Sequence, residues 1–194
     1  MYELIILSLL MYGPLHGYLI AKITNDMIGP WAKVSNGTMY PLLTRLEKEG
    51  LIQASTEGNE QQHGDRRLRS FMITDSGQKR FHQLMMDTTS NPGEYQRFFR
   101  FKVPHLALVK SVERLHLLDH YINYCQTHIL YTKSEAEDIV QETSAHKYYM
   151  SPIRLEATLD LIEQMANQWQ AELDWVKRLR EKEIARGITA EESV

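Results

Sequence analysis

The sequence predicts a mainly α-helical protein whose helices are interrupted once by a short hairpin of strands. Three observations support this fold class. Three helix patterns come before residue 50, two strand patterns joined by a polar and basic loop follow, and a long apolar repeat fills the second half. This order is typical of a winged helix-turn-helix DNA-binding domain, here residues 1–90, followed by an all-helical dimerisation domain, residues 91–194.

Two helices are predicted before residue 30. The first, residues 2–12, is almost wholly apolar and should be buried on most sides, and Gly13 and Pro14 then supply a turn residue and a helix breaker. The second, residues 17–27, repeats its apolar residues at helical spacing and carries Lys22 on its polar side. Both helices are therefore expected to support a third.

The third helix is predicted between Ser35, a favoured N-cap residue, and Gly50, a residue that often follows a helix C-terminus. Its interior contains Pro41, and on propensity alone a helix would end there. The apolar stripe of this helix leaves an outward face that carries Asn36, Thr38, Tyr40, Thr44 and Arg45.

A basic hairpin is predicted after the third helix. One strand begins at Leu51, residues 56–64 form a polar loop, and residues 68–73 form the return strand, before a fourth helix over residues 76–88. Arginine suits DNA because its planar fork is permanently charged and pairs with phosphates or enters a narrow minor groove. The basic residues of the hairpin, or wing, are His63, Arg66, Arg67 and Arg69.

The third helix and the wing are therefore expected to contact DNA together. The helix would read base edges, and the wing would contact phosphate or the minor groove. The candidate DNA contacts are Lys33, Ser35, Asn36, Thr38, Tyr40, Thr44, Arg45, His63, Arg66, Arg67 and Arg69, and Lys22 is also expected to face the duplex.

Five stretches of the first 85 residues resemble the PadR-type transcriptional regulators. They are Ile-Leu-Ser-Leu-Leu at 6–10, Gly-Pro-Leu-His-Gly-Tyr at 13–18, Val-Ser-Asn-Gly-Thr-Met-Tyr-Pro-Leu-Leu at 34–43, Arg-Leu-Glu-Lys-Glu-Gly-Leu-Ile at 45–52 and Ile-Thr-Asp-Ser-Gly at 73–77. The resemblance explains Pro41, since family members carry a Tyr-Pro pair inside the recognition helix. Asn36 departs from the family because a proline is common there, and Ser70 and Phe71 stand where two tyrosines are common.

The resemblance also implies a function. It implies a repressor of a neighbouring operon that binds an inverted-repeat operator as a homodimer and is released by a phenolic acid or another aromatic compound. The second half is similar to the helical C-terminal domain of the subfamily related to virulence activators. In that subfamily the C-terminal helices dimerise and also touch the neighbouring DNA-binding domain.

The second half is predicted to contain three main helices. Residues 108–132 carry one packing seam that includes Cys125, interpreted as a small core residue, and residues 134–148 form a separate helix. The last helix begins with Ser151 as its cap and ends before Gly187, and its apolar residues repeat at alternating spacings of four and three. The candidate dimer contacts on this helix are Leu159, Ile162, Met165, Trp169, Leu173 and Val176. Met165, Trp175 and Leu179 form a second apolar strip beside the repeat, and a second subunit is one partner that this strip could have.

An aromatic and basic cluster near the turns of the second half is the candidate effector site. Aromatic faces would stack on a ring, and an arginine would pair with a carboxylate. A hinge packed by its own tyrosines explains the same residues. They are Tyr95, Arg97, His146, Tyr148, Tyr149 and Arg154.

Charge is balanced in the half that is expected to bind DNA. Residues 1–90 hold nine Lys and Arg and nine Asp and Glu, for a net charge of 0, and residues 91–194 hold 13 and 16, for a net charge of −3. This balance argues against non-specific coating of DNA, so locally placed cations must supply the affinity.

Several other classes of protein are not expected. The longest apolar run, residues 4–12, is too short to span a bilayer, and a single cysteine cannot form an intrachain disulfide, so a cytoplasmic protein is indicated. The sequence contains no phosphate-binding loop and no nucleophile elbow, so neither an enzyme nor a bound cofactor is expected. His116 and His120 have the spacing of a metal pair but project away from the seam. The competing interpretation is a winged-helix protein-assembly module without sequence-specific DNA binding.

Overall fold

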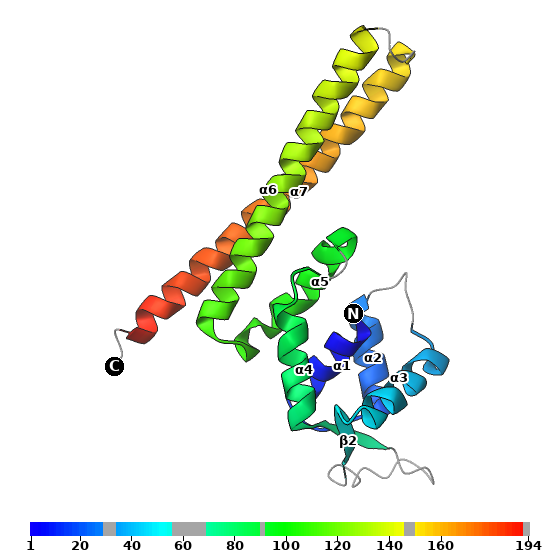
Figure 1. Cartoon of the computed structure of the whole chain (residues 1–194), viewed down its shortest axis with the longest axis vertical. Coiled ribbons are helices and arrows are strands. Elements are labelled where there is room, and N and C mark those ends of the chain that lie inside the picture. Colours follow the sequence, from blue (N-terminus) through cyan, green and yellow to red (C-terminus); the bar gives the residue numbers. More distant parts are fainter. Residues whose placement is uncertain (29–33, 56–68, 90–91, 146–149, 192–194) are drawn as a thin grey trace. The chain divides into compact units, whose positions relative to one another are not determined.

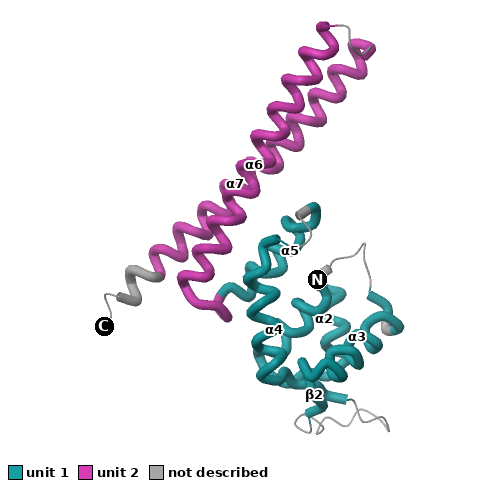
Figure 2. The backbone as a smooth tube through the Cα atoms, viewed as in Figure 1, with its two compact units in different colours: residues 1–106 teal, residues 107–194 magenta. Residues whose placement is uncertain are grey.

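The computed structural model describes residues 1–28, 34–55, 69–89, 92–145 and 150–191. It divides the chain into two units, residues 1–106 and residues 107–194, hereafter unit 1 and unit 2 (Figure 2). The division lies after Leu106 and not at residue 90, because Tyr95 and Phe99 of the intervening helix are buried and the ammonium of Lys102 hydrogen-bonds the main chain of Asp87.

Unit 1 consists of helices with a small sheet along one edge (Figure 1). Its elements are α1 (Tyr2–Leu10), β1 (Leu15–His16), α2 (Gly17–Ile28), α3 (Asn36–Lys48), β2 (Ile52–Ser55), β3 (Ser70–Ile73), α4 (Asp75–Met86) and α5 (Tyr95–Lys102), with 3-10 turns at Pro92–Glu94 and Val103–Leu108. The apolar α1 contacts both α2 and α4 and has five buried aliphatic side chains, as its composition predicts. The fold is the winged helix-turn-helix that the sequence predicts.

The sheet has the strand order β1-β3-β2, with β3 in the centre and both pairings antiparallel. Ile52 lies opposite Ile73 in the wing hairpin, and Leu15 lies opposite Phe71. The sequence did not indicate β1, because two residues cannot show an alternating pattern and their pairing with β3 is long-range. The wing loop, residues 56–68, lies outside the described residues.

The predicted C-terminal end of α3 is confirmed, and α4 starts one residue before the predicted residue 76 and ends at Met86, two residues before the predicted end. Gly50 follows the last turn of α3 with a φ of +71°, a left-handed conformation that glycine adopts without steric cost. The hydroxyl of Thr74 accepts a hydrogen bond from the amide of Gly77 at 3.1 Å and so caps α4. Pro41 does not end α3, and the carbonyl of Gly37, which loses its usual amide donor, belongs to an exposed residue that water can reach.

Unit 2 is an antiparallel pair of long helices, α6 (Ser111–Ser144) and α7 (Pro152–Glu191). The separate helix predicted over residues 134–148 is wrong, because α6 continues through Ser134 in a stretch without glycine or proline. The expected end of the last helix before Gly187 is also wrong, since α7 extends to Glu191. Among the described residues, no helix combines the length and apolar character that crossing a membrane would need.

The seam between α6 and α7 is rotated slightly from the predicted one. Leu118, Cys125 and Ile129 are buried as expected, whereas Leu115 and Ile122 are half-buried. Leu117 and Tyr121 take the central places that those two residues were expected to fill. The seam also contains polar pairs, because Tyr121 donates a 2.6 Å hydrogen bond to the buried carboxylate of Glu172 and, nearer the start of α6, Arg114 pairs with the buried Glu183.

Candidate nucleic-acid interface

The outward face of α3 is arranged as the sequence predicts. Met39, Leu43 and Leu46 are buried in the core of unit 1, which fixes the rotation of the helix. The candidate contacts on the opposite side are exposed, namely Thr38, Tyr40, Thr44 and Arg45. Lys33, His63, Arg66 and Arg67, and the side chain of Asn36, lie outside the described residues.

The start of α3 is held by a residue that the sequence did not single out. The side chain of Asn25 in α2 accepts a 2.7 Å hydrogen bond from the amide of Val34 and donates a 3.2 Å bond to its carbonyl. Val34 directly precedes Ser35, so these two bonds fix α3 relative to α2. Ser35 is the N-cap residue by position, but its hydroxyl lies 3.1 Å from the hydroxyl of Thr38 and makes no cap bond to the main chain.

Tyr40 is both anchored and exposed. A Cβ atom built on Gly17 would lie 3.3 Å from Cε1 of Tyr40, 3.3 Å from Cε2 of Phe71 and 3.5 Å from Cδ1 of Leu43. The Tyr40 ring therefore packs against a glycine at the start of α2, and 45% of the residue remains exposed. Any larger residue at position 17 would crowd this ring, so Gly17 sets the position of a candidate DNA contact.

Arg69 has a structural role that the sequence did not indicate. Its Nη2 lies 2.6 Å from Oε1 of Glu47 in α3, and its guanidinium lies 5.2 Å from the centre of the Phe71 ring. Its carbonyl accepts a 3.1 Å hydrogen bond from the amide of Gly17. Arg69 thus joins the base of the wing to the recognition helix and to the start of α2.

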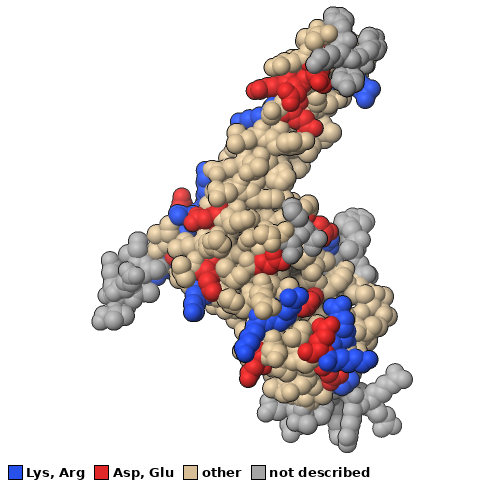
Figure 3. All heavy atoms as spheres, in the orientation of Figure 1, with Lys and Arg blue, Asp and Glu red and all other residues tan. Residues whose placement is uncertain are grey.

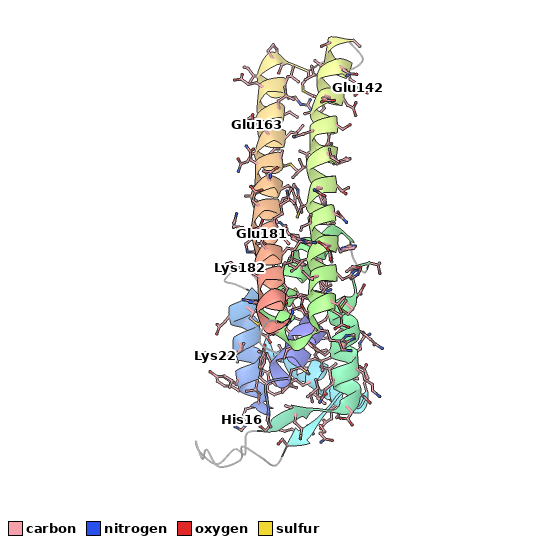
Figure 4. All side chains as sticks on the ribbon, turned by 90° about the vertical axis from the view of Figure 1, so that its left-hand side faces the viewer. His16, Lys22, Glu142, Glu163, Glu181 and Lys182 are labelled. Atoms are coloured by element: carbon pink, nitrogen blue, oxygen red, sulfur yellow. The ribbon has the colours of Figure 1, made fainter. Side chains whose placement is uncertain are left out.

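The charges of unit 1 are mixed. On the face drawn in Figure 3, the described Lys and Arg side chains alternate with Asp and Glu and form no continuous basic surface. Lys22 is exposed on α2 and points outward (Figure 4), whereas Arg45 forms a 3.5 Å ion pair with Glu49. The described cations on this surface are therefore isolated from one another, as expected from the net charge of 0.

The predicted effector residues are divided between the two units, and half of them lie outside the described residues. Tyr95 is buried in unit 1 beside Phe99, and Arg97 is exposed on the same helix. Arg154 is exposed on α7 in unit 2, and the remaining three, His146, Tyr148 and Tyr149, fall outside the described residues.

Half of the predicted dimer contacts are already used within the chain. Ile162, Leu173 and Val176 are buried, because they face α6. Trp169 is half-buried, and its ring stacks on His128 with centroids 4.2 Å apart and an interplanar angle of 11°. These residues hold the two helices together, so the idea that all six face a second subunit is wrong for the buried three.

A different strip of α7 faces solvent. Leu161 is 59% exposed and Met165 is 43% exposed, and Trp175 and Leu179 are half-buried. Successive spacings of 4, 10 and 4 residues place these four side chains on one side of the helix. Met165, Trp175 and Leu179 belong to the second apolar strip expected from the sequence, whereas Leu161 was missed because it lies outside the main repeat.

The histidine pair and the cysteine that the sequence singled out lie on α6. His116 is exposed, as expected, whereas His120, which was also expected to project outward, is half-buried. Cys125 is fully buried between α6 and α7. Over the described ranges, no cluster of three or more His, Cys, Asp or Glu residues is placed to hold a metal ion.

Comparison with known proteins finds a related family. The family model described as "Transcriptional regulator PadR-like family" matches residues 6–83. A transcriptional regulator from Clostridium thermocellum is 30% identical, with 42% of this chain and 74% of that chain covered and a TM-score of 0.35. No curated protein matches the chain.

Two structures of PadR from Bacillus subtilis are also similar. The one in complex with operator DNA is 19% identical, covers 93% of this chain and 96% of that chain, and has a TM-score of 0.40. The one in complex with p-coumaric acid is 18% identical, covers 93% and 97%, and has a TM-score of 0.39. Family members are DNA-binding transcriptional regulators and not enzymes. The chain, with a winged helix-turn-helix that matches the family sequence over residues 6–83, belongs to the PadR-like family of transcriptional regulators.

Proposed function

We propose that this chain represses a neighbouring operon in the cytoplasm by binding an inverted-repeat operator as a homodimer, and that a small aromatic effector releases it. The observation that carries the DNA-binding part is the exposed face of α3, where Thr38, Tyr40, Thr44 and Arg45 project from a helix whose opposite side is buried. A helix presented in this way fits a major groove, and the wing beside it would follow the backbone.

The homodimer is supported by the strip of α7 that contains Leu161, Met165, Trp175 and Leu179. Apolar side chains exposed along one side of a long helix favour a helical partner, and a second copy of α7 offers the same strip. Two-fold symmetry in the protein requires two half-sites related by the same axis, which is the reason for proposing an inverted repeat.

Charge argues against DNA contact at the free end of unit 2. Residues 134–163 hold seven acidic and two basic residues, and Glu142 and Glu163 lie on the two helices toward this end (Figure 4). Such a surface repels phosphate. The proposed DNA contact is therefore confined to α3, the wing and nearby cations such as Lys22.

Replacing Arg66 and Arg67 with alanine is expected to weaken binding to operator and random DNA alike. Each phosphate contact releases counterions from the DNA when the protein binds. Because the variant makes fewer such contacts, the slope of log affinity against log salt should become shallower by roughly one to two units. Electrophoretic shifts of the chain's own upstream region over a salt series measure this. Lys177→Ala with Arg178→Ala removes two exposed charges from unit 2 and should leave the slope unchanged. If the variant without Arg66 and Arg67 shows the same salt dependence of DNA affinity as the wild type, the protein-assembly module is favoured instead.

Gly17→Ala is expected to reduce discrimination between operator and random DNA. The new methyl group must displace the Tyr40 ring, which lies 3.3 Å from its position, while the better helix propensity of alanine offsets part of the crowding. Tyr40→Ala should cost roughly tenfold in operator affinity, and Gly17→Ala a smaller amount in the same direction. The measurement is the ratio of the two dissociation constants at fixed salt. Gly93→Ala, where no atom lies within 4 Å of the new methyl group, is the control. If neither Tyr40→Ala nor Gly17→Ala changes the ratio of the dissociation constants for operator and random DNA, Tyr40 does not contact the operator.

The effector part is supported by the p-coumaric acid complex of the Bacillus subtilis protein, which shows that this ligand can bind a PadR-type fold. A ligand releases the chain only if it binds the DNA-free form more tightly than the DNA-bound form. Titrating phenolic acids into the operator complex therefore tests this part separately from DNA binding.

A further inference from the structure

The first turn of α3 lacks the side-chain cap that its sequence predicts. The first amides of a helix have no partner inside the helix, and a serine before them usually accepts a hydrogen bond from one of them. Here the hydroxyl of Ser35 lies 3.1 Å from the hydroxyl of Thr38 and accepts no cap bond from a described main-chain amide. The Ser35 carbonyl accepts bonds from the amides of Thr38 and Met39, at 2.9 and 3.0 Å, so the turn is formed. A residue outside α3 is needed to fix where this turn lies.

Asn25, in the last turn of α2, holds the residue that leads into α3. Its side-chain oxygen accepts a 2.7 Å hydrogen bond from the amide of Val34, and its side-chain nitrogen donates a 3.2 Å bond to the carbonyl of Val34. Two bonds between two planar amide groups fix orientation as well as distance, whereas a single bond would act as a pivot. Val34 is buried, so both of its main-chain groups need partners, and Asn25 supplies them.

The part of α2 that carries Asn25 is firmly anchored. Ile20, Ala21 and Thr24 are buried, and α2 contacts both α1 and α3. Asn25 follows directly after Thr24 and is itself half-buried. The core of unit 1 therefore sets the position of Asn25, and the two hydrogen bonds transfer that position to the start of α3.

We propose that Asn25 is a positioning residue for operator recognition, which holds the first turn of α3 so that Thr38 meets a base edge. Thr38 lies four residues, or about one helical turn, after Val34. A shift of Val34 thus moves Thr38 more directly than it moves Thr44, which lies about 9 Å farther along α3. The inference rests on the proposed DNA binding and adds to it a residue that acts through α3 and not by contact with DNA.

The first test compares operator and random DNA. Asn25→Ala should weaken operator binding roughly tenfold, because Thr38 no longer meets its base edge in the favoured geometry. Binding to random DNA and the salt dependence of affinity should stay as in the wild type, because phosphate contacts supply both. The ratio of the two dissociation constants is measured for the full-length chain over a salt series, with its own upstream region as the operator. Asn123→Ala, at an exposed asparagine of α6, is the matched control and should keep the wild-type ratio.

A double-mutant cycle distinguishes positioning from a general loss of stability. If Asn25 acts through Thr38, Thr38→Ala should lower operator affinity severalfold in the wild type and much less in Asn25→Ala. Thr44→Ala should lower operator affinity by the same factor in both backgrounds, because Thr44 lies away from the turn that Asn25 holds. A merely structural role of Asn25 would lower the melting temperature and leave both pairs of substitutions additive.

Asn25→Asp guards against the case in which Asn25→Ala does not fold. The carboxylate still accepts a bond from the Val34 amide but has no donor for the Val34 carbonyl, so the ratio should lie between those of the wild type and Asn25→Ala. The ratio is the right comparison, since the added charge repels the phosphates of both DNAs alike. Hydrogen exchange reports on the turn itself. In both variants the amides of Thr38 and Met39 should exchange faster, while the amide of Leu46 keeps its protection.

The outcomes separate this inference from the proposed function. If the wild type prefers operator to random DNA and both Asn25 variants keep that preference in full, the positioning role is overturned and the proposed function stands. If the preference falls but the cycle with Thr38→Ala is additive, Asn25 does not act through Thr38 and the positioning role is again overturned. If the preference falls and Thr38→Ala has little further effect, the role is established. If the wild type has no preference, the proposed function fails and the positioning role fails with it.

Discussion

Replacing Leu161 and Met165 with aspartate is expected to lower operator affinity by roughly 10²- to 10⁴-fold, the range by which linking two binding modules raises avidity. In the proposed dimer each half-site is held by one recognition helix, and the second half-site binds at a high effective concentration. Four carboxylates facing each other across a two-fold axis would be buried without partners, so the subunits should separate. Each remaining monomer would bind one half-site weakly.

This change should leave each subunit folded. Leu161 and Met165 are exposed in the isolated chain, so their replacement removes little from the seam between α6 and α7. The control is Asn167→Asp with Ala171→Asp, which adds the same two charges at the same spacing on exposed positions about 120° around the helix. Sedimentation at micromolar concentration should give a monomer for the first variant and a dimer for the control. A dimer with wild-type operator affinity for both would exclude this strip as the interface.

Much of unit 1 could be predicted because its signals are local. The ends of α3 and α4 are encoded by Gly50 and Thr74, whose conformations and hydrogen bonds depend on residues close by in sequence. The exposed face of α3 follows in the same way from the spacing of Met39, Leu43 and Leu46. The candidate DNA-contact face is thus largely a consequence of helical periodicity.

What could not be predicted depends on residues far apart in sequence. The pairing of Arg69 with Glu47 spans 22 residues, and the contact of Lys102 with Asp87 forms only when α5 packs beside the end of α4. Ser134 is a residue type that favours the start of a helix, and a new helix was therefore predicted there. In the structure α6 continues through Ser134, because its continuous packing against α7 outweighs that local preference. For the same reason the seam residues of α7 looked like dimer contacts, since periodicity shows an apolar face but not which partner covers it.

Gly77→Ala is expected to destabilise unit 1 by about 3 kcal/mol or more, at or above the upper end of the usual cost of overpacking. A Cβ atom on Gly77 would lie 2.0 Å from the carbonyl oxygen of Leu51 and 2.7 Å from Cγ1 of Ile73. The Leu51 oxygen cannot move away freely, because it accepts hydrogen bonds from both the amide and the hydroxyl of Thr74, each at 3.1 Å. The new methyl group would therefore have to separate α4 from the turn between α3 and β2.

Hydrogen exchange can assign this loss to one unit. Amides of α3, β2, β3 and α4 should exchange faster in Gly77→Ala, while those of α6 and α7 keep their protection, because the helical pair has its own buried seam. The melting temperature of unit 1 should fall by about 12 °C or more, at roughly 4–8 °C per kcal/mol for a domain of this size. Gly93→Ala makes the same chemical change where nothing lies within 4 Å and should stay within about 0.5 kcal/mol of the wild type. If Gly77→Ala and Gly93→Ala have the same melting temperature, α4 can shift without cost. The close approach of Gly77 to Leu51 would then not be what holds the recognition helix α3 and the wing in register.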